Sequence, residues 1–285
     1  MPFFIKLLLA VIILALLGFF AMVIYDRFLH PATTQPSKEV EFNGYVIPIS
    51  ENVSKNELDP QLFYEEDGRM YYDDENVKYG IDVSSHQNDI DWKAVADSGV
   101  EFAIIRAGYR GYGSAGTVNA DEYFEKNING ALENGIDVGV YFFSQAITEE
   151  EARQEAEFVL ETISGYDITY PVIYDWEHMD NIETARTYDY SGLDVSAFAN
   201  AFCSVISEAG YDTSVYFNPS YGYMIYDVEE INNHTFWLAE YKPLPDFYYE
   251  FIIWQYSNKG TVPGIEGDVD LNMSFIDLDK AEENE

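Results

Sequence analysis

Short apolar runs alternate with amphipathic segments from Tyr79 onward, and this alternation constrains the fold more than any other feature of the chain. Short runs rich in β-branched and aromatic residues are typical of buried strands, and the longer amphipathic segments between them are typical of helices. The apolar runs cover residues 79–83, 102–106, 138–142, 171–174, 213–217, 235–239, 251–254 and 269–271. Strands separated by helices are parallel and are joined by right-handed crossovers. About eight of them over roughly 200 residues predict an α/β fold, an irregular, TIM-like (β/α) barrel.

Acidic and polar residues gather where these predicted strands end. They are Asp82, Arg106, Tyr141, Asp175, Glu177 and Asp270. In a (β/α) barrel the carboxyl ends of the strands meet at one rim, and active sites lie there. The sequence therefore predicts that these side chains come together.

Asp175 and Glu177 are the most informative pair, because they stand two residues apart at the end of a buried strand. Side chains at such positions point the same way, with Cα atoms about 6.5 to 7 Å apart. Two carboxylates at that spacing raise the pKa of at least one, as a proton donor near neutral pH requires. Glycoside hydrolysis is the reaction class that most often uses such a pair. A chain with 51 Asp and Glu also produces solvated acid pairs by chance, so the other motifs have to decide.

The composition excludes several classes of function. A formal net charge of −36 argues against nucleic acid as a partner, since phosphate contacts need clustered Lys and Arg. The four histidines show no i, i+4 pairing, so the sequence does not indicate a zinc site. Cys203 is the only cysteine, which excludes an intrachain disulfide. A neutral or mixed-charge substrate is expected.

The amino-terminal part differs in composition from the rest. Residues 7–25 carry no charge, a span close to the ~20 residues that cross a bilayer as a helix, and Lys6 precedes them. We expect residues 1–26 to be a single-pass transmembrane anchor with the catalytic domain extracytoplasmic; the alternative is a cleaved signal peptide and secretion. Residues 27–78 read as a linker or stalk with a possible β-hairpin around Asp67-Gly68, and residues 79–285 as the catalytic barrel.

Four motifs together resemble one known family. They are Gly80-Ile81-Asp82-Val83-Ser84-Ser85-His86-Gln87 with Ile90-Asp91-Trp92, then Tyr174-Asp175-Trp176-Glu177, Trp254-Gln255-Tyr256-Ser257 and Val269-Asp270-Leu271-Asn272. In this order the chain, from about residue 79 to 276, resembles the glycoside hydrolase family 25 lysozymes. The resemblance implies a barrel that cleaves the β-1,4 bond between N-acetylmuramic acid and N-acetylglucosamine in peptidoglycan, and it implies no cofactor and no metal.

The resemblance also implies roles for individual residues. Glu177 would be the general acid and base, Asp175 its partner, and Asp82 and Asp270 acidic groups of the same cleft. Asp175 could stabilise positive charge at the anomeric carbon, orient the substrate's N-acetyl group or attack directly, and the sequence does not choose among these. The candidate substrate-binding residues are Arg106, Tyr141, Tyr216 and Gln255. Arg106 could equally be a counter-ion that holds the barrel mouth together.

Two other functions compete with this one. A catalytically silent cell-wall binding protein could retain the same barrel, although the intact acidic cluster counts against it. A chitinase-like glycosidase would also use closely spaced Asp and Glu on a barrel strand. In the main hypothesis the chain is a monomeric peptidoglycan hydrolase attached to the membrane through its amino-terminal helix, with no nucleic acid partner.

The run from Gly111 to Gly116 fits the glycine pattern of a dinucleotide-binding loop. Residues 117–120 intervene before the next predicted helix, so no helix amino terminus would face a pyrophosphate there. We interpret this run as a loop.

Overall fold

The computed structural model describes residues 38–276, and the chain divides into two compact units, residues 1–50 and 51–285. The described part of the first unit is an antiparallel hairpin of β1 (Glu39–Phe42) and β2 (Tyr45–Pro48). Its turn, Asn43-Gly44, has positive φ angles of 51° and 80°. Asn-Gly is the sequence that such a two-residue turn favours, because both positions need a left-handed backbone.

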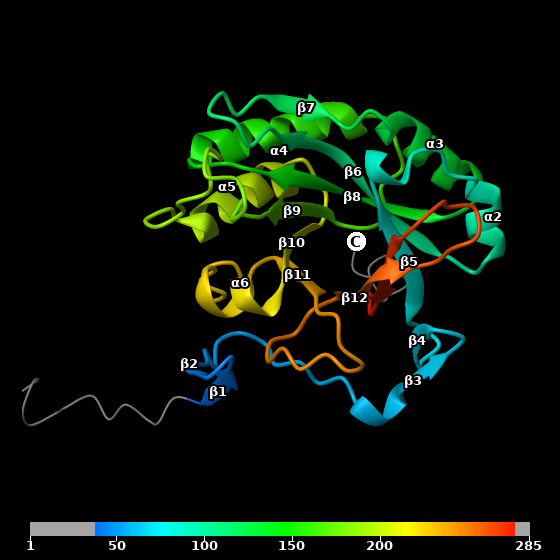
Figure 1. Ribbon diagram of the computed structural model, residues 1–285, viewed down its shortest axis with the longest axis horizontal. Helices are drawn as coiled ribbons and strands as arrows, with labels where there is room; N and C mark the ends of the chain where they lie inside the picture. The colour runs from blue at the N-terminus through cyan, green and yellow to red at the C-terminus, as the bar shows by residue number, and fades with distance from the viewer. Residues whose placement is uncertain (1–37, 277–285) are drawn as a thin grey trace, which may run out of the picture. The chain divides into compact units, whose positions relative to one another are not determined.

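Within the described part of the second unit, eight strands close a barrel (Figure 1). They are β5 (Lys78–Val83), β6 (Phe102–Arg110), β8 (Asp137–Ser144), β9 (Val172–Trp176), β10 (Thr213–Phe217), β11 (Thr235–Ala239), β12 (Ile253–Gly260) and β13 (Val269–Ser274). The order around the barrel is β5-β13-β12-β11-β10-β9-β8-β6, and β6 pairs back with β5. Each strand overlaps one of the apolar runs of the sequence.

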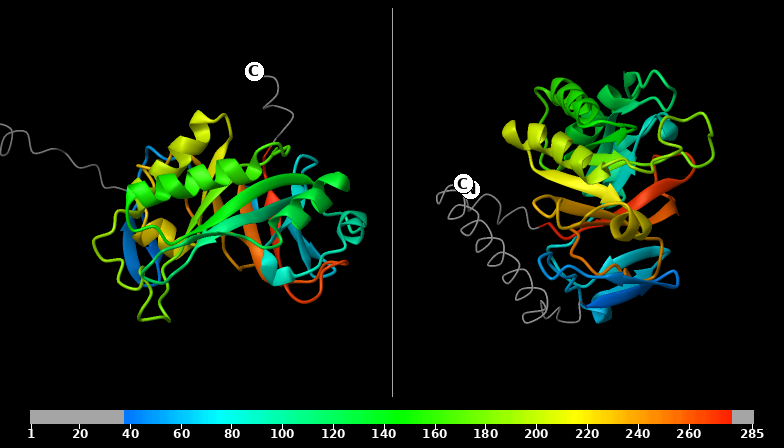
Figure 2. Two further views of the ribbon diagram at one scale, coloured as in Figure 1. Left: turned by 90° about the horizontal axis from the view of Figure 1, so that it is seen from above. Right: turned by 90° about the vertical axis from the view of Figure 1, so that its left-hand side faces the viewer.

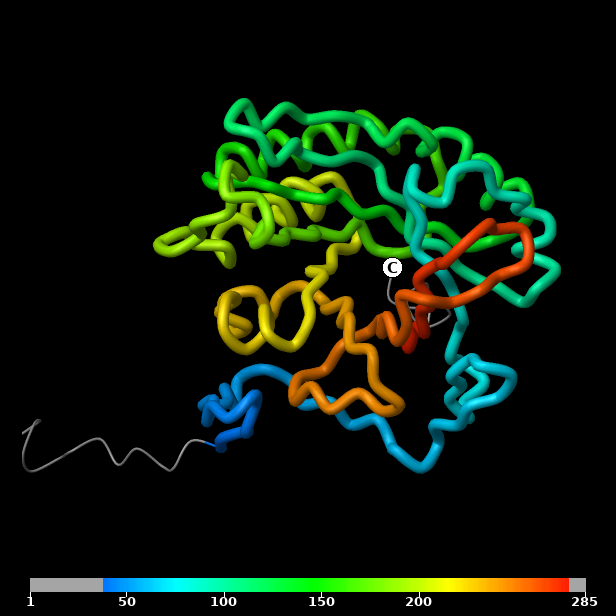
Figure 3. The backbone as a smooth tube through the Cα atoms, in the orientation of Figure 1, coloured from blue at the N-terminus to red at the C-terminus, as the bar shows by residue number. Residues whose placement is uncertain are grey.

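The expected TIM-like (β/α) barrel is nevertheless wrong, because the barrel is mixed and sheet-rich. β13 runs antiparallel to both of its neighbours, β12 and β5. Only residues 261–268 join β12 to β13, and a parallel crossover needs a dozen or more residues. The chain therefore turns straight back, and Figure 3 shows this return as a loop near the red end of the tube. A hydrogen bond of 2.9 Å from the Asp91 N–H to the Gly264 carbonyl fixes this loop to the segment between β5 and β6.

The three longer helices of the described part pack outside one half of the barrel (Figure 2). They are α3 (Phe124–Glu133), α4 (Glu149–Ile163) and α5 (Val195–Glu208), and they cover β6, β8, β9 and β10. Side-chain caps set the starts of two of them: Thr148 caps α4 and Asp194 caps α5, and three glutamates in the first turn of α4 interact favourably with its helix dipole. The remaining helices, α2 (Trp92–Asp97) and α6 (Pro219–Met224), are short.

On the other half of the barrel, the segment before β5 supplies cover where long helices do not. It contains the 3-10 turn η2 (Pro60–Leu62) and the antiparallel hairpin of β3 (Phe63–Glu66) and β4 (Arg69–Tyr72). The Phe63 ring lies 5.5 Å from that of Trp254, and the Tyr72 ring 5.6 Å from that of Phe275. The turn Asp67-Gly68 has φ angles of 49° and 78°. The hairpin thus buries aromatic rings against the outer face of β12 and the end of β13.

The interior of the barrel has an apolar layer and, above it, a polar one. Phe102, Ile104, Ile173, Trp237 and Ile253 are buried together, with Tyr170 below them. Two residues further along three of these strands, the inward positions are Arg106, Asp175 and Gln255. Period-two alternation keeps these positions on the same face, so the sequence that fills the core also delivers polar groups to the rim.

The glycine run at 111–116 is the turn between β6 and β7 (Val118–Ala120), an antiparallel extension of the sheet. The Gly111 N–H donates to the Thr117 carbonyl, 2.9 Å, as expected across a hairpin. The next helix, α3, begins only at Phe124, so no helix amino terminus stands at the glycines.

The predicted transmembrane segment, residues 1–26, lies outside the described residues. Residues 38–276 contain no helix with the length and apolar character of a membrane span. The predicted boundaries of the linker, 27–78, and of the barrel domain, 79–285, stay predictions.

Candidate active site

The polar layer forms one rim because of how the strands are aligned. Asp175 of β9 is aligned with Tyr216 of β10 on one side and with Phe143 of β8 on the other. Arg106 of β6 is likewise aligned with Tyr141 of β8. Neighbouring residues at one level of a parallel sheet point the same way, so their side chains share the barrel mouth.

Asp82 is buried at this rim, with 5% of its surface exposed, and is held by two side-chain amides. Its Oδ2 accepts from Gln255 Nε2 and from Asn272 Nδ2, each at 2.7 Å. Asn272 is fixed in turn by the Trp237 indole N–H, which donates to its Oδ1 at 2.8 Å. Burial raises the pKa of Asp82 well above its ordinary value, and the charge of Asp270 raises it further, while the two amides oppose the rise.

Asp270 lies at the same rim, but on a strand that runs in the opposite direction to the one the sequence suggested. It lies near the start of β13, not at a carboxyl end, and it is aligned with Asp82 because β13 is antiparallel to β5. Burial raises the pKa of Asp270 to about 6, and a hydrogen bond from Asp82 opposes the rise. Burial therefore disfavours the charged form of both carboxyls of this pair.

Asp175 and Glu177 form a second acidic pair at the end of β9. Asp175 is 5% exposed, Glu177 is half-buried, and within the described residues Asp175 Oδ1 is buried without a hydrogen-bond partner. Burial raises the pKa of Asp175 well above its ordinary value; the charges of Glu177 and Asp82 raise it further, and Arg106 lowers it. Burial also raises the pKa of Glu177. Two such carboxyls titrate as a unit, so the pair retains a proton at pH values where isolated carboxyls have lost theirs.

The two predicted tyrosines line the mouth between the acidic pairs. Their rings contact Trp237 edge-on, with centroids 6.0 Å away for Tyr141 and 4.7 Å away for Tyr216. The Tyr216 hydroxyl donates to Gln255 Oε1 at 3.4 Å. Burial raises the pKa of Tyr141 well above its ordinary value; Arg106 lowers it, and the charges of three aspartates, Asp82, Asp175 and Asp270, raise it further. The structure thus brings the eight residues predicted for the site to one rim.

Arg106 is held by two polar partners, Asp121 and Ser85. Its Nε donates to Asp121 Oδ2 at 2.8 Å, and its Nη2 lies 2.7 Å from the same oxygen and 3.0 Å from Ser85 Oγ. The Asp121 side chain is fully buried, so this is a shielded, charge-assisted pair. These contacts favour the counter-ion reading of Arg106; a contact with substrate stays a prediction.

Gln145 fixes the backbone of Glu177 and was not found from the sequence. It is fully buried, and its Nε2 donates to the Glu177 carbonyl oxygen. Its Oε1 accepts from Thr187 Oγ1 at 2.5 Å, and the Met179 N–H donates to the same hydroxyl at 3.3 Å. Gln145 therefore joins the end of β8 to the loop that leaves β9, at Glu177 and again at Thr187.

We expect Gln145→Met to lower kcat about 10- to 100-fold with little change in KM, because methionine fills the space but leaves the Glu177 backbone free to move. Steady-state kinetics on a soluble glycan would measure this split. Gln154→Met, an exposed change on α4, is the matched control. A kcat within twofold of the control would show that Gln145 does not position Glu177.

Three further residues of the site were missed, for different reasons. Asn272 stands in a quoted motif, but its burial and its bond to Asp82 depend on the reversed β13. Tyr241 lies two residues after β11, and its hydroxyl donates to Gln255 Oε1 at 2.7 Å. A search that included the first three residues after each predicted strand could have found Tyr241 and Gln145, whereas no sequence signal marks Thr187.

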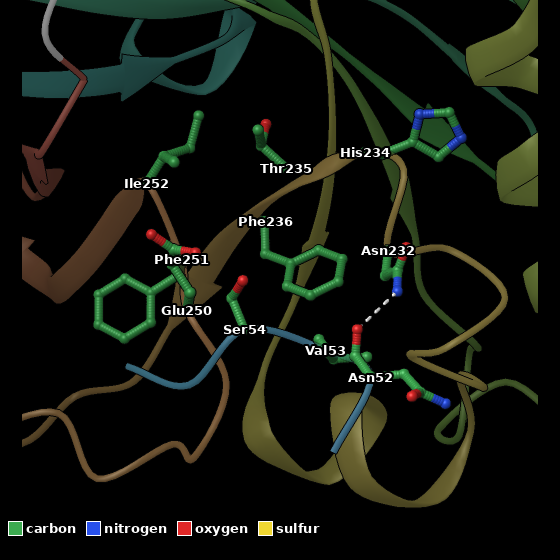
Figure 4. Close-up of a pocket in the computed structure, with 10 residues that line it drawn as sticks. All are labelled: Asn52, Val53, Ser54, Asn232, His234, Thr235, Phe236, Glu250, Phe251 and Ile252. Carbon is green, nitrogen blue, oxygen red and sulfur yellow. Dashed lines mark hydrogen bonds between the residues drawn. The ribbon is translucent and has the colours of Figure 1, made fainter. Parts of the chain in front are cut away.

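A separate hollow of about 280 Å³ lies near the amino ends of β11 and β12, away from the rim that carries the carboxylates (Figure 4). Its histidine, His234, is 7% exposed, and both ring nitrogens have partners, Thr213 Oγ1 at 2.8 Å and Asn200 Oδ1 at 3.1 Å. Burial lowers the pKa of His234 to about 4. A neutral, fully hydrogen-bonded histidine of this kind serves packing, so we do not place catalysis there.

Comparisons with known proteins give relatives that are named as lysozymes. The autolytic lysozyme of Clostridium acetobutylicum is 28% identical over 194 residues, which are 68% of this chain and 54% of that protein. Lysozyme M1 of Streptomyces globisporus is 29% identical over 206 residues, 68% of this chain and 66% of that protein. The chain thus spans about half the length of the first relative and about two thirds of the second.

A solved structure, the modular autolysin LytC from Streptococcus pneumoniae, aligns with a TM-score of 0.61 and 25% identity over 83% of this chain and 57% of that one. The family model for glycosyl hydrolases family 25 matches residues 81–265, more than half of the chain, and these residues hold both acidic partners of the β9 pair. The resemblance drawn from the motifs is confirmed, and the chain belongs to glycosyl hydrolases family 25.

Proposed function

We propose that this protein is a peptidoglycan hydrolase of the lysozyme type, which cleaves the β-1,4 bond between N-acetylmuramic acid and N-acetylglucosamine. The observation that carries the proposal is the pair of Asp175 and Glu177 at the mouth of a family 25 barrel, where burial raises the pKa of both carboxyls. The relatives named as lysozymes and autolysin support the same activity.

In the proposed reaction, Glu177 donates its proton to the glycosidic oxygen as the bond to the anomeric carbon breaks. Glu177 suits this role because burial raises its pKa and because it lies, half-buried, at the mouth. Asp175 then faces the positive charge that develops on the sugar, and its Oδ1 has no hydrogen-bond partner within the described residues. Glu177, now ionised, takes a proton from the incoming water.

Asp82 and Asp270 act around this pair by charge and by hydrogen bonding. The amides of Gln255 and Asn272 hold Asp82 in one orientation, so the acidic surface facing the substrate is fixed before the substrate binds. Such preorganisation is effective because no group has to move as charge develops. We propose that the aromatic rings of Tyr141 and Tyr216 contact the sugar rings.

The decisive experiment is digestion of purified peptidoglycan, followed by borohydride reduction and mass spectrometry of the new reducing ends. We expect reduced muramic acid at those ends. Reduced glucosamine would assign a different bond specificity, release of chitooligosaccharides from chitin in place of this activity would assign a chitinase, and wall binding without any release would assign a silent binding protein.

We also propose that the barrel acts as a monomer outside the cytoplasm. Every residue of the acidic cluster comes from one chain, and peptidoglycan is extracytoplasmic. Residues 1–26 would keep the protein associated with the cell membrane, whereas cleavage there would release it. Cell fractionation of the full chain distinguishes membrane-associated from secreted protein.

A further inference from the structure

A groove of about 340 Å³ lies beside the rim, between the β3–β4 hairpin and the end of β12. The hairpin contributes Gly68 and Met70, and the end of β12 contributes Tyr256 and Asn258. The segment after β11 forms the third side and contributes Tyr241. The groove is thus built partly from residues that precede the family match at 81–265.

Tyr241 connects the groove to the acidic cluster. Its side chain is 51% exposed, and its hydroxyl donates at 2.7 Å to Gln255 Oε1, while Gln255 Nε2 donates at 2.7 Å to Asp82. The charges of Asp270, Asp82 and Glu177 all act on the Tyr241 hydroxyl. One end of the groove therefore lies a single hydrogen bond from the residue that orients Asp82.

The hairpin is held firmly enough to form a binding wall. Phe63 packs on Trp254, and the Arg69 guanidinium donates to the Ser98 carbonyl at 3.3 Å. The Tyr72 hydroxyl accepts from the Asp59 N–H at 3.1 Å, and the Tyr72 N–H donates to the Tyr79 hydroxyl at 3.1 Å. Two aromatic anchors and these hydrogen bonds fix both strands of the hairpin against the barrel.

The chemistry of the groove suits an uncharged sugar. Aromatic rings and a thioether supply apolar surface, while the Asn258 amide and the Ser257 hydroxyl can bond to hydroxyl and N-acetyl groups. The positive charge of Lys242 is already balanced, since its Nζ lies 3.0 Å from Glu240 and 2.7 Å from Asp246. The two other charged residues of the lining, Glu65 and Lys259, carry opposite signs, so the groove presents no excess of positive charge for the carboxylates of a stem peptide.

We propose that this groove is an additional saccharide subsite, which takes an N-acetylated sugar of the glycan strand beyond the two sugars that flank the cleaved bond. The proposal rests on the proposed hydrolase function and adds to it: the β3–β4 hairpin makes the enzyme selective for longer glycans. A bound sugar would stack against Tyr241 and bond to the Asn258 amide.

The test compares a tetrasaccharide and an octasaccharide of alternating N-acetylglucosamine and N-acetylmuramic acid as substrates of the full-length protein. Asn258→Trp fills the groove without touching the acidic cluster, and Asn129→Trp, an equally exposed asparagine on α3, is the matched control. We expect Asn258→Trp to lower kcat/KM on the octasaccharide about tenfold, to the wild-type value on the tetrasaccharide, and to leave the tetrasaccharide rate unchanged.

Equal rates for the two variants on both substrates, with an active wild type, would overturn the subsite but leave the hydrolase function standing. A wild type that cleaves neither glycan would overturn both. Calorimetric binding of the octasaccharide to Glu177→Gln, with and without Asn258→Trp, gives a readout independent of turnover, and we expect affinity to fall about tenfold.

Discussion

Glu177→Gln is expected to lower kcat on peptidoglycan by roughly 10²- to 10⁴-fold, the range that general acid catalysis contributes. Glutamine keeps the shape of the side chain but has no proton to give to the leaving sugar. Initial rates of reducing-end release measure the effect. Glu183→Gln, an exposed carboxyl in the same β9–α5 loop, is the matched control and should retain wild-type activity.

The pH dependence of the wild type tests the same assignment. Burial raises the pKa of Glu177, so its acid form persists above the ordinary range and is lost as pH rises through the raised value. We expect kcat/KM to fall on the alkaline side for this reason. Thermal unfolding of Glu177→Gln at neutral pH should be no easier than that of the wild type, because glutamine cannot ionise in a site where burial disfavours the charged form. Activity of Glu177→Gln within tenfold of wild type would assign the acid role to another carboxyl, and Asp270 would be the first to examine.

Glu155→Leu is expected to destabilise the fold by about 3–5 kcal/mol, as the loss of one partner of a buried ion pair does. Glu155 is fully buried, with Oε1 2.5 Å from Arg110 Nε and Oε2 2.6 Å from Ser144 Oγ. Burial raises the pKa of Glu155 to about 7, while Arg110 and Ser144 oppose the rise. Without Glu155, the Arg110 side chain remains buried with its charge unpaired.

Urea unfolding measures this loss, and two variants sharpen the interpretation. Glu157→Leu, exposed on the same helix, should stay within about 0.5 kcal/mol of wild type. The double variant Arg110→Met with Glu155→Leu should recover most of the stability, because neither charge is then left buried. A double variant as unstable as Glu155→Leu alone would show that the loss of stability comes from poor packing of leucine at this position and not from the unpaired charge of Arg110.

This ion pair also bears on the active site. Arg110 donates from Nη1 to the Gly116 carbonyl at 2.7 Å and from Nη2 to the Glu151 carbonyl at 2.8 Å, which ties the β6–β7 turn to α4. Ser144, bonded to Glu155, immediately precedes Gln145, which holds Glu177. Stability and catalytic geometry therefore share one chain of contacts.

Local patterns in the sequence were sufficient to place the strands and to predict that the candidate site residues lie at one rim. Apolar runs place strands because burial demands them, and the period-two alternation from Ile173 to Asp175 to Glu177 places a carboxyl pair at the rim. The direction of β13 could not be read from such a pattern, since a strand looks the same in either direction. Only the short connection at 261–268 indicated an antiparallel strand. The regular alternation of strands and helices before it predicted a parallel one instead.

The supporting residues depend on contacts between distant segments. Gln145 and Thr187 meet across 42 positions of sequence, and Asp82 and Asn272 across 190. No local propensity records such a contact, because it exists only after the barrel has closed. Arg106 illustrates the same limit: its place at a strand end was visible, but its partner Asp121 was not.

Closure through β13 has a kinetic consequence. On one edge, β5 pairs with β6, which follows it closely in the sequence. On its other edge it pairs with β13, which is synthesised much later, with Gly80 opposite Asn272. Pairings of such high contact order form slowly, and a chain emerging from the ribosome folds its earlier segments first. During synthesis, the amide that orients Asp82 and the carboxyl of Asp270 arrive together with the last strand. The nascent polypeptide consequently acquires its complete acidic centre in the final step of folding, when the barrel closes.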